Sequence, residues 1–222
     1  MKITFDSNVW RIVTSPATFP KEQALSSFQI INQQIRLGHL QGFLSETVFT
    51  LEAIKKVDRR KLITEYNPPF KIQETIQDGV TKLSISIEPD RVSHPGNNSY
   101  LTTHLNDALQ LGFKLLWCPR MAWIANPGLQ RDWFIELAEA EISPYQEVFG
   151  AVVTEIKKHG CGSHDLEAIG RSYAIVDEHW TEGIKNAPAL EDRTIAKAFA
   201  EWADADAIAA HIASVSYTHL RA

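Results

Sequence analysis

The chain has 222 residues, of which 44% are hydrophobic, and this is enough for one domain with a full core. Its formal net charge of −5 argues against a protein that coats nucleic acid through bulk positive charge. The sequence has no apolar run long enough to span a membrane and no signal-peptide pattern, so we expect a cytoplasmic protein without a membrane partner.

The first segment predicts a strand that ends at a carboxylate. Residues 2–5 form a short strand pattern, and Asp6, Ser7 and Asn8 follow before the sequence becomes apolar again at Val9. Binding groups of open α/β sheets collect at the carboxyl ends of strands. Asp6 is therefore either a candidate ligand or the cap of a helix that begins at Ser7 or Asn8.

A second candidate acid lies in the apolar segment 43–54. The segment predicts a strand end, an N-cap at Ser45 and a helix. Glu46 falls in the first turn, where a carboxylate complements the helix dipole. Glu52 lies in mid-helix among apolar residues, so it is either a ligand or the i+4 partner of Lys56.

The densest basic cluster of the sequence follows at 55–61. We expect the helix to continue through it, so that Glu52, Lys56 and Arg59 share one stripe at i, i+4 and i+7. Lys56 and Arg59 would then lie beside a metal site, where they could bind phosphate. The alternative is that they form the solvated C-terminal end of a helix.

The stretch 63–190 predicts mostly helices. Strand patterns occur at 82–87 and 113–117, and a helix that ends at Gly112 precedes the second of them. Asp107 on that helix is a rival candidate acid. A zinc site around His159, Cys161 and His164 is disfavoured, because zinc sites of this type need paired cysteines and Cys118 stands alone.

The segment 191–213 predicts one long helix with a carboxylate in its apolar stripe. The stripe recurs every 3.6 residues and consists of Ile195, Phe199, Trp202, Ala209 and Ala213. Asp206 falls in the middle of it, and Asp204 points to the opposite face. An ionised carboxylate in a core needs a partner, which could be backbone N–H groups, a metal, or an arginine such as Arg11 or Arg193.

Three acidic motifs of this sequence resemble those of PIN-domain proteins. They are Asp6-Ser7-Asn8, then Ser45-Glu46-Thr47 leading to Leu51-Glu52-Ala53, and Asp206 to Ala213. The resemblance implies an α/β, three-layer fold with a central parallel sheet. It also implies an endoribonuclease that holds Mg²⁺ or Mn²⁺ on carboxylates and hydrolyses phosphodiester bonds with an activated water.

In this interpretation Asp6, Glu52 and Asp206 are the metal ligands and the catalytic residues. Asn8 and Asp204 surround them as hydrogen-bonding or peripheral groups. The expected substrate is RNA, and an antitoxin-like protein is a further expected partner.

The resemblance also predicts how the chain is divided. A single PIN-like domain would span 1–213, with its core at 1–62 and 191–213 and a large helical insertion at 63–190. Residues 214–222 lack strand alternation and resemble a non-native tail. The family's last acidic motif would then be missing, and this 222-residue form would be a weak or inactive nuclease.

Two other functions fit the same residues. One is a non-catalytic module that binds nucleic acid or protein on a PIN-like fold. The other is a helical interaction protein in which an arginine neutralises Asp206. The positions of the Asp6, Glu52 and Asp206 carboxylates distinguish a metal site from these alternatives, because a shared metal ion requires all three within its coordination reach.

Overall fold

The computed structural model describes residues 1–66, 70–77, 80–87, 94–95, 99–119 and 129–219. The first half contains β1 (Lys2–Thr4), α1 (Trp10–Thr14), η1 (Pro16–Thr18), α2 (Leu25–Arg36), β2 (Gln41–Ser45), η2 (Val48–Glu52), η3 (Lys56–Asp58), α3 (Arg59–Thr64), β3 (Phe70–Gln77) and β4 (Val80–Ile87). The second half contains α4 (Ser99–Gln110), β5 (Lys114–Leu116), η5 (Arg131–Trp133), α5 (Glu139–Lys158), α6 (His164–Tyr173), α7 (Trp180–Asn186), η6 (Ala189–Glu191) and α8 (Asp192–His219).

A small parallel sheet organises the chain. Its strand order is β1-β2-β5, with Ile3 opposite Gly42 and Leu44 opposite Leu115. Since all three strands run in the same direction, their carboxyl ends meet at one edge of the sheet. The predicted α/β class with a parallel sheet is confirmed at this level, and the PIN-like topology stays a prediction.

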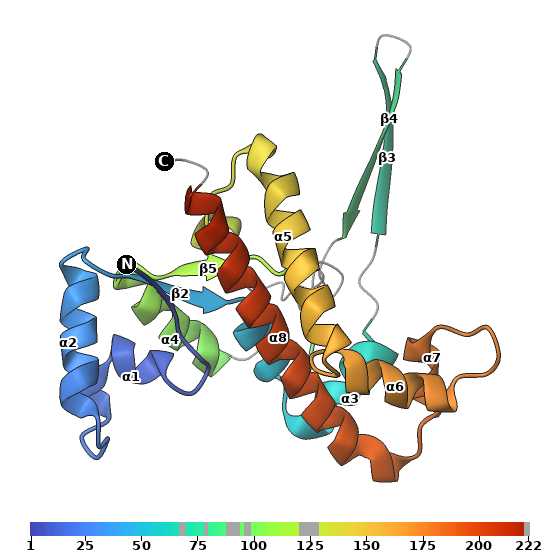
Figure 1. The fold of residues 1–222 in the computed structure, drawn as a ribbon, viewed down its shortest axis with the longest axis horizontal. Coiled ribbons are helices and arrows are strands. Elements are labelled where there is room, and N and C mark those ends of the chain that lie inside the picture. The colour runs from blue at the N-terminus through green and yellow to red at the C-terminus, as the bar shows by residue number, and fades with distance from the viewer. Residues whose placement is uncertain (67–69, 78–79, 88–93, 96–98, 120–128, 220–222) are drawn as a thin grey trace.

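Helices cover both faces of this sheet. Successive strand residues point to opposite faces, so Leu44 and Leu115 join a core with α1, α2 and α4, while Phe43 and Leu116 join a core with α5 and α8. Figure 1 shows the two helix groups on either side of the strands. The sheet edge with the three strand ends therefore lies between two helical layers.

The stretch 63–190, expected as an insertion, contributes to this sheet. β5 pairs with β2 along its length, and α4 packs on α1. The sequence pattern at 113–117 predicts the strand itself. Its place in the central sheet depends on a long-range pairing that periodicity does not show.

The long helix α8 has the predicted apolar stripe. Every member of the stripe is buried, with an exposure of at most 4% at Trp202, and Asp206 is 0% exposed. The helix packs along α5 and reaches the ends of β2 and β5. The prediction of a carboxylate inside the core is therefore confirmed.

The single helix expected from Ser45 to Arg59 is wrong. A π-helical turn, η2, ends at Glu52, and the backbone of Lys55 is extended at φ −57 and ψ 141 before η3 and α3 begin. π-Helical turns are rare and are frequently found at functional sites. Because of this break, Glu52, Lys56 and Arg59 do not share one helical stripe.

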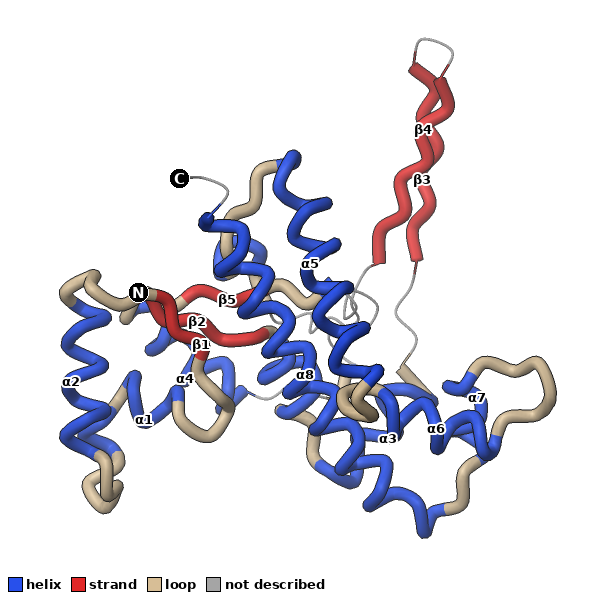
Figure 2. Tube along the Cα trace, in the orientation of Figure 1, coloured by secondary structure: helices blue, strands red, loops and turns tan. Residues whose placement is uncertain are grey.

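The strands β3 and β4 form an antiparallel hairpin that projects from the helical body (Figure 2). The sequence predicts β4 but not its partner β3. Ile72, Ile76 and Leu83 are exposed on the hairpin. Among the described residues, no helix has the length and apolar character to cross a membrane.

Candidate metal centre

Three carboxylates meet beside the carboxyl end of β1. Asp6, Glu52 and Asp204 each offer an oxygen, and these oxygens lie within 4.8 Å of one another. Carboxylate oxygens are the ligands that Mg²⁺ and Mn²⁺ prefer. Like charges this close repel unless a cation or protons neutralise them. The donor set and its spacing therefore fit a divalent ion after a small contraction.

Asp6 is held by the turn that follows β1. Phe5 N donates to Phe43 O at 3.0 Å, which extends the pairing of β1 with β2 by one residue. Val9 N then donates to Asp6 O at 3.0 Å and closes the turn. Asn8 Nδ2 donates to Asp6 Oδ2 at 3.0 Å. The asparagine thus has the position expected of a residue that orients a ligand carboxylate.

Glu52 is the half-buried member of the cluster. Burial raises its pKa most, and the charges of Asp204 and Asp6 raise it further, while a hydrogen bond from Ser7 and the charge of Arg59 lower it. A raised pKa means that the ionised form lacks compensating charge. A bound cation would supply that charge.

Asp204 takes the third position, where Asp206 was expected. Burial raises the pKa of Asp204 first, followed by the charges of Asp6 and Glu201, and Arg59 lowers it. Residues two apart on a helix point about 200° apart. Because Asp206 faces the sheet, Asp204 faces the flank of α8, and the Asp6 and Glu52 carboxylates lie on that flank. The sequence pattern favoured Asp206 because it lies in a buried stripe. The spacing of the carboxylate oxygens instead groups the exposed Asp204 with Asp6 and Glu52.

The neighbour of Asp206 is Glu46. Burial raises the pKa of Glu46 to about 8, although a backbone hydrogen bond from Cys118 opposes this, and the charge of Asp206 adds to it. Glu46 is thus protonated at neutral pH, which removes like-charge repulsion from Asp206. The sequence contained a weak signal, because apolar pairs at 43–44 and 48–49 flank Glu46 on both sides, but its first-turn position indicated a solvated dipole partner. The Arg193 considered as a partner of Asp206 is exposed.

Arg59, expected to bind phosphate, is 8% exposed, and its guanidinium makes hydrogen bonds within the fold. Its Nη1 donates to Ala196 O at 2.6 Å and its Nε to Ile54 O at 3.4 Å, which ties η2 and α3 to α8. Desolvation lowers its pKa, while Glu52 and Asp204 raise it. The positive charge of Arg59 therefore stabilises the ionised forms of Glu52 and Asp204. The Lys56 side chain, in contrast, is exposed to solvent.

Two grooves adjoin the cluster. The first, the cationic groove, has a volume of about 770 Å³ and is lined by Lys56, Arg59, Arg193, Lys197 and Ala200, among others. The second, the β1 groove, measures about 670 Å³, contains Asp6 and Asp204, and extends to Lys2, Thr4 and His211. Two of the three acids therefore line the β1 groove, and Arg59, whose charge acts on Glu52 and Asp204, lines the cationic groove.

The other candidate ligands of the sequence do not join this site. Asp107 lies on α4 near His104, and His159 and His164 contact Glu155 and Asp165 respectively. In the part of the chain that the structure describes, the three acids beside β1 form the one group with metal-binding spacing.

The chain matches no protein-family model, and comparison with curated proteins and with solved structures gives no match either. The PIN-like assignment therefore rests on the acidic motifs alone and stays a prediction. The geometry of Asp6, Glu52 and Asp204 stands independently of any relative.

Proposed function

We propose that this protein is a metal-dependent phosphodiesterase of PIN-like type that cleaves RNA, with the ion held by Asp6, Glu52 and Asp204. The observation that carries the proposal is the meeting of their oxygens within 4.8 Å. The preference for RNA comes from the resemblance of the acidic motifs. The open grooves on either side of the cluster are consistent with a polymeric substrate.

The chain's own residues prepare the site in two ways. Asn8 fixes the Asp6 carboxylate and Ser7 fixes that of Glu52, so the ligands keep their geometry without the ion. Arg59 limits the repulsion between the acids. Bound Mg²⁺ or Mn²⁺ would neutralise phosphate charge and lower the pKa of a coordinated water.

Metal binding should raise thermal stability. A ligand that binds only the native state at about a hundred times its Kd adds ~2.7 kcal/mol, which is roughly 5–10 °C for a chain of this size. Asp204→Asn should abolish the shift and slightly raise metal-free stability, because it relieves repulsion from Asp6 and Glu52. Differential scanning fluorimetry with Mg²⁺, Mn²⁺ or EDTA measures both effects.

The matched control is Asp165→Asn, which removes an exposed carboxylate on α6. It should keep the full metal shift. A wild-type protein without a shift, or an equal shift in Asp204→Asn, would show that these acids hold no ion.

A further inference from the structure

The two grooves lie along one face of α8. Residues at spacings of three or four share a helix face, and Arg193, Lys197, Ala200, Asp204, Ala207 and His211 follow this spacing. The first three line the cationic groove and the last three the β1 groove. From Arg193 to His211 the helix rises about 27 Å. Asp204, and with it the acidic cluster, lies between the ends of this face.

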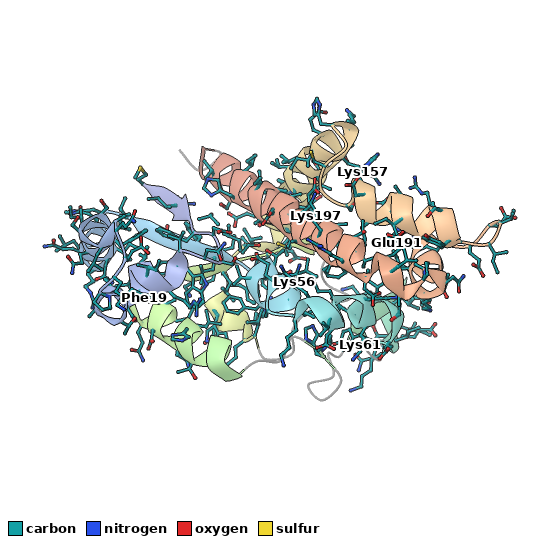
Figure 3. All side chains as sticks on the ribbon, turned by 90° about the horizontal axis from the view of Figure 1, so that it is seen from below. Phe19, Lys56, Lys61, Lys157, Glu191 and Lys197 are labelled. Atoms are coloured by element: carbon teal, nitrogen blue, oxygen red, sulfur yellow. The ribbon has the colours of Figure 1, made fainter. Side chains whose placement is uncertain are left out.

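The lining of the cationic groove includes one carboxylate, Asp192, which is engaged by Arg60. Within the described ranges, no hydrogen bond or ion pair there engages the side chains of Lys56, Arg193 or Lys197, whereas the nearby Arg60 pairs with Asp192 at 2.9 Å. Figure 3 shows Lys56 on η3 and Lys197 on α8, on adjacent elements. Four cationic side chains, those of Lys56, Arg59, Arg193 and Lys197, line the groove against the one carboxylate of Asp192, and in a chain of net charge −5 this local positive excess favours an anionic ligand.

The β1 groove is chemically different. Thr4 Oγ1 lies 2.7 Å from His211 Nδ1, and the two form a hydrogen-bonded pair in the groove. Ile3 and the 53% exposed Ile208 supply apolar surface next to it. Apolar surface beside hydrogen-bonding groups suits a nucleoside better than a bare phosphate.

We propose that a single strand of nucleic acid lies along this face of α8. Lys56, Arg193 and Lys197 hold its phosphates at one end, and Ile208 and the Thr4–His211 pair hold a nucleoside at the other. Cleavage of the strand at the acidic cluster, which lies between these two ends, rests on the proposed function. A span of about 27 Å corresponds to on the order of four to six nucleotides.

Binding of fluorescein-labelled single-stranded RNA to the intact chain in EDTA tests the strand path without cleavage. Arg193→Gln/Lys197→Gln should weaken binding about tenfold at low salt. It should also reduce the slope of log K against log salt by about 1.4, since each single-strand phosphate contact contributes about 0.7. His211→Ala should weaken binding without changing the slope, because it removes a nucleoside contact. Affinity should rise with oligonucleotide length and level off near six nucleotides.

The matched control is Lys21→Gln/Lys158→Gln, which removes two exposed charges that line neither groove and should leave affinity and slope unchanged. An equal loss in this control, or equal affinity for duplex RNA or for polyphosphate, would overturn the strand path. Since the binding assay contains no metal, it tests the strand path independently of the proposed cleavage activity. Strand binding without cleavage would contradict the proposed function alone, and cleavage unaffected by Arg193→Gln/Lys197→Gln would contradict the strand path alone.

Discussion

Replacement of Asp204 by asparagine is expected to reduce metal-dependent RNA cleavage by about a hundredfold or more. Asp204 is one of three oxygen donors around a common point, and its loss leaves the ion two carboxylates and a less defined position. A misplacement of about 1 Å costs on the order of a hundredfold in rate. Asp6→Asn and Glu52→Gln should have effects of the same size. Initial rates on a labelled oligonucleotide in Mg²⁺ and in Mn²⁺ give the comparison.

Asp206→Asn distinguishes the proposed site, which contains Asp204, from the one that the motif resemblance implies. Asp206 is fully buried against Glu46 and lies outside the cluster, so its substitution should reduce the rate far less than Asp204→Asn when both variants are folded. Circular dichroism establishes that they are folded. A hundredfold loss in Asp206→Asn with full activity in Asp204→Asn would reinstate the motif assignment. If wild type and variants all bind RNA and none cleaves it, the chain is a non-catalytic binding module.

Local patterns predicted the elements that form the site. The strand before Asp6, the helix that carries Asp206, and the buried stripe from Ile195 to Ala213 all follow from periodicity and are observed. Periodicity reports which face of an element is buried, because burial of apolar groups is what it encodes. It therefore identified the buried face of α8 correctly.

The identity of the third acid required information that periodicity does not contain. Asp204 and Asp206 point in nearly opposite directions, and the choice between them depends on where the turn after β1 and the η2 turn lie relative to α8. The break at Lys55 that ends η2 early has no proline or glycine to signal it. Long-range packing decides both features: Arg59 donates to Ala196 O across 137 residues of sequence.

The cationic groove illustrates the same limit. The sequence identified the basic cluster at 55–61, but Arg193 and Lys197 lie far along the chain at the start of α8. Within the cluster, Arg59 is buried, and Lys61 pairs with Asp58 at 2.9 Å. Only the fold separates the cations used for structure from the exposed Lys56.

Glu46→Gln should remove a large pH dependence of stability. The pKa of Glu46 is raised from 4.5 to about 8 in the folded chain, chiefly by burial, so between these values the folded state holds a proton that the unfolded state has released. Stability from this group is therefore fully present below about pH 4.5. It decreases as the pH rises and is lost above about pH 8, with a total effect on the order of several kcal/mol.

Glutamine is neutral at every pH and has nearly the same shape as protonated glutamate. The variant should therefore match the wild type near pH 5 and exceed its unfolding free energy by several kcal/mol at pH 8.5. Urea unfolding in EDTA at both pH values measures the difference, and Glu136→Gln, an exposed carboxylate, should show no such gain. A Glu46→Gln protein that is less stable than wild type at pH 8.5 would mean that the Glu46 carboxylate is ionised in the fold and held by donors that the amide cannot replace, which would contradict the raised pKa.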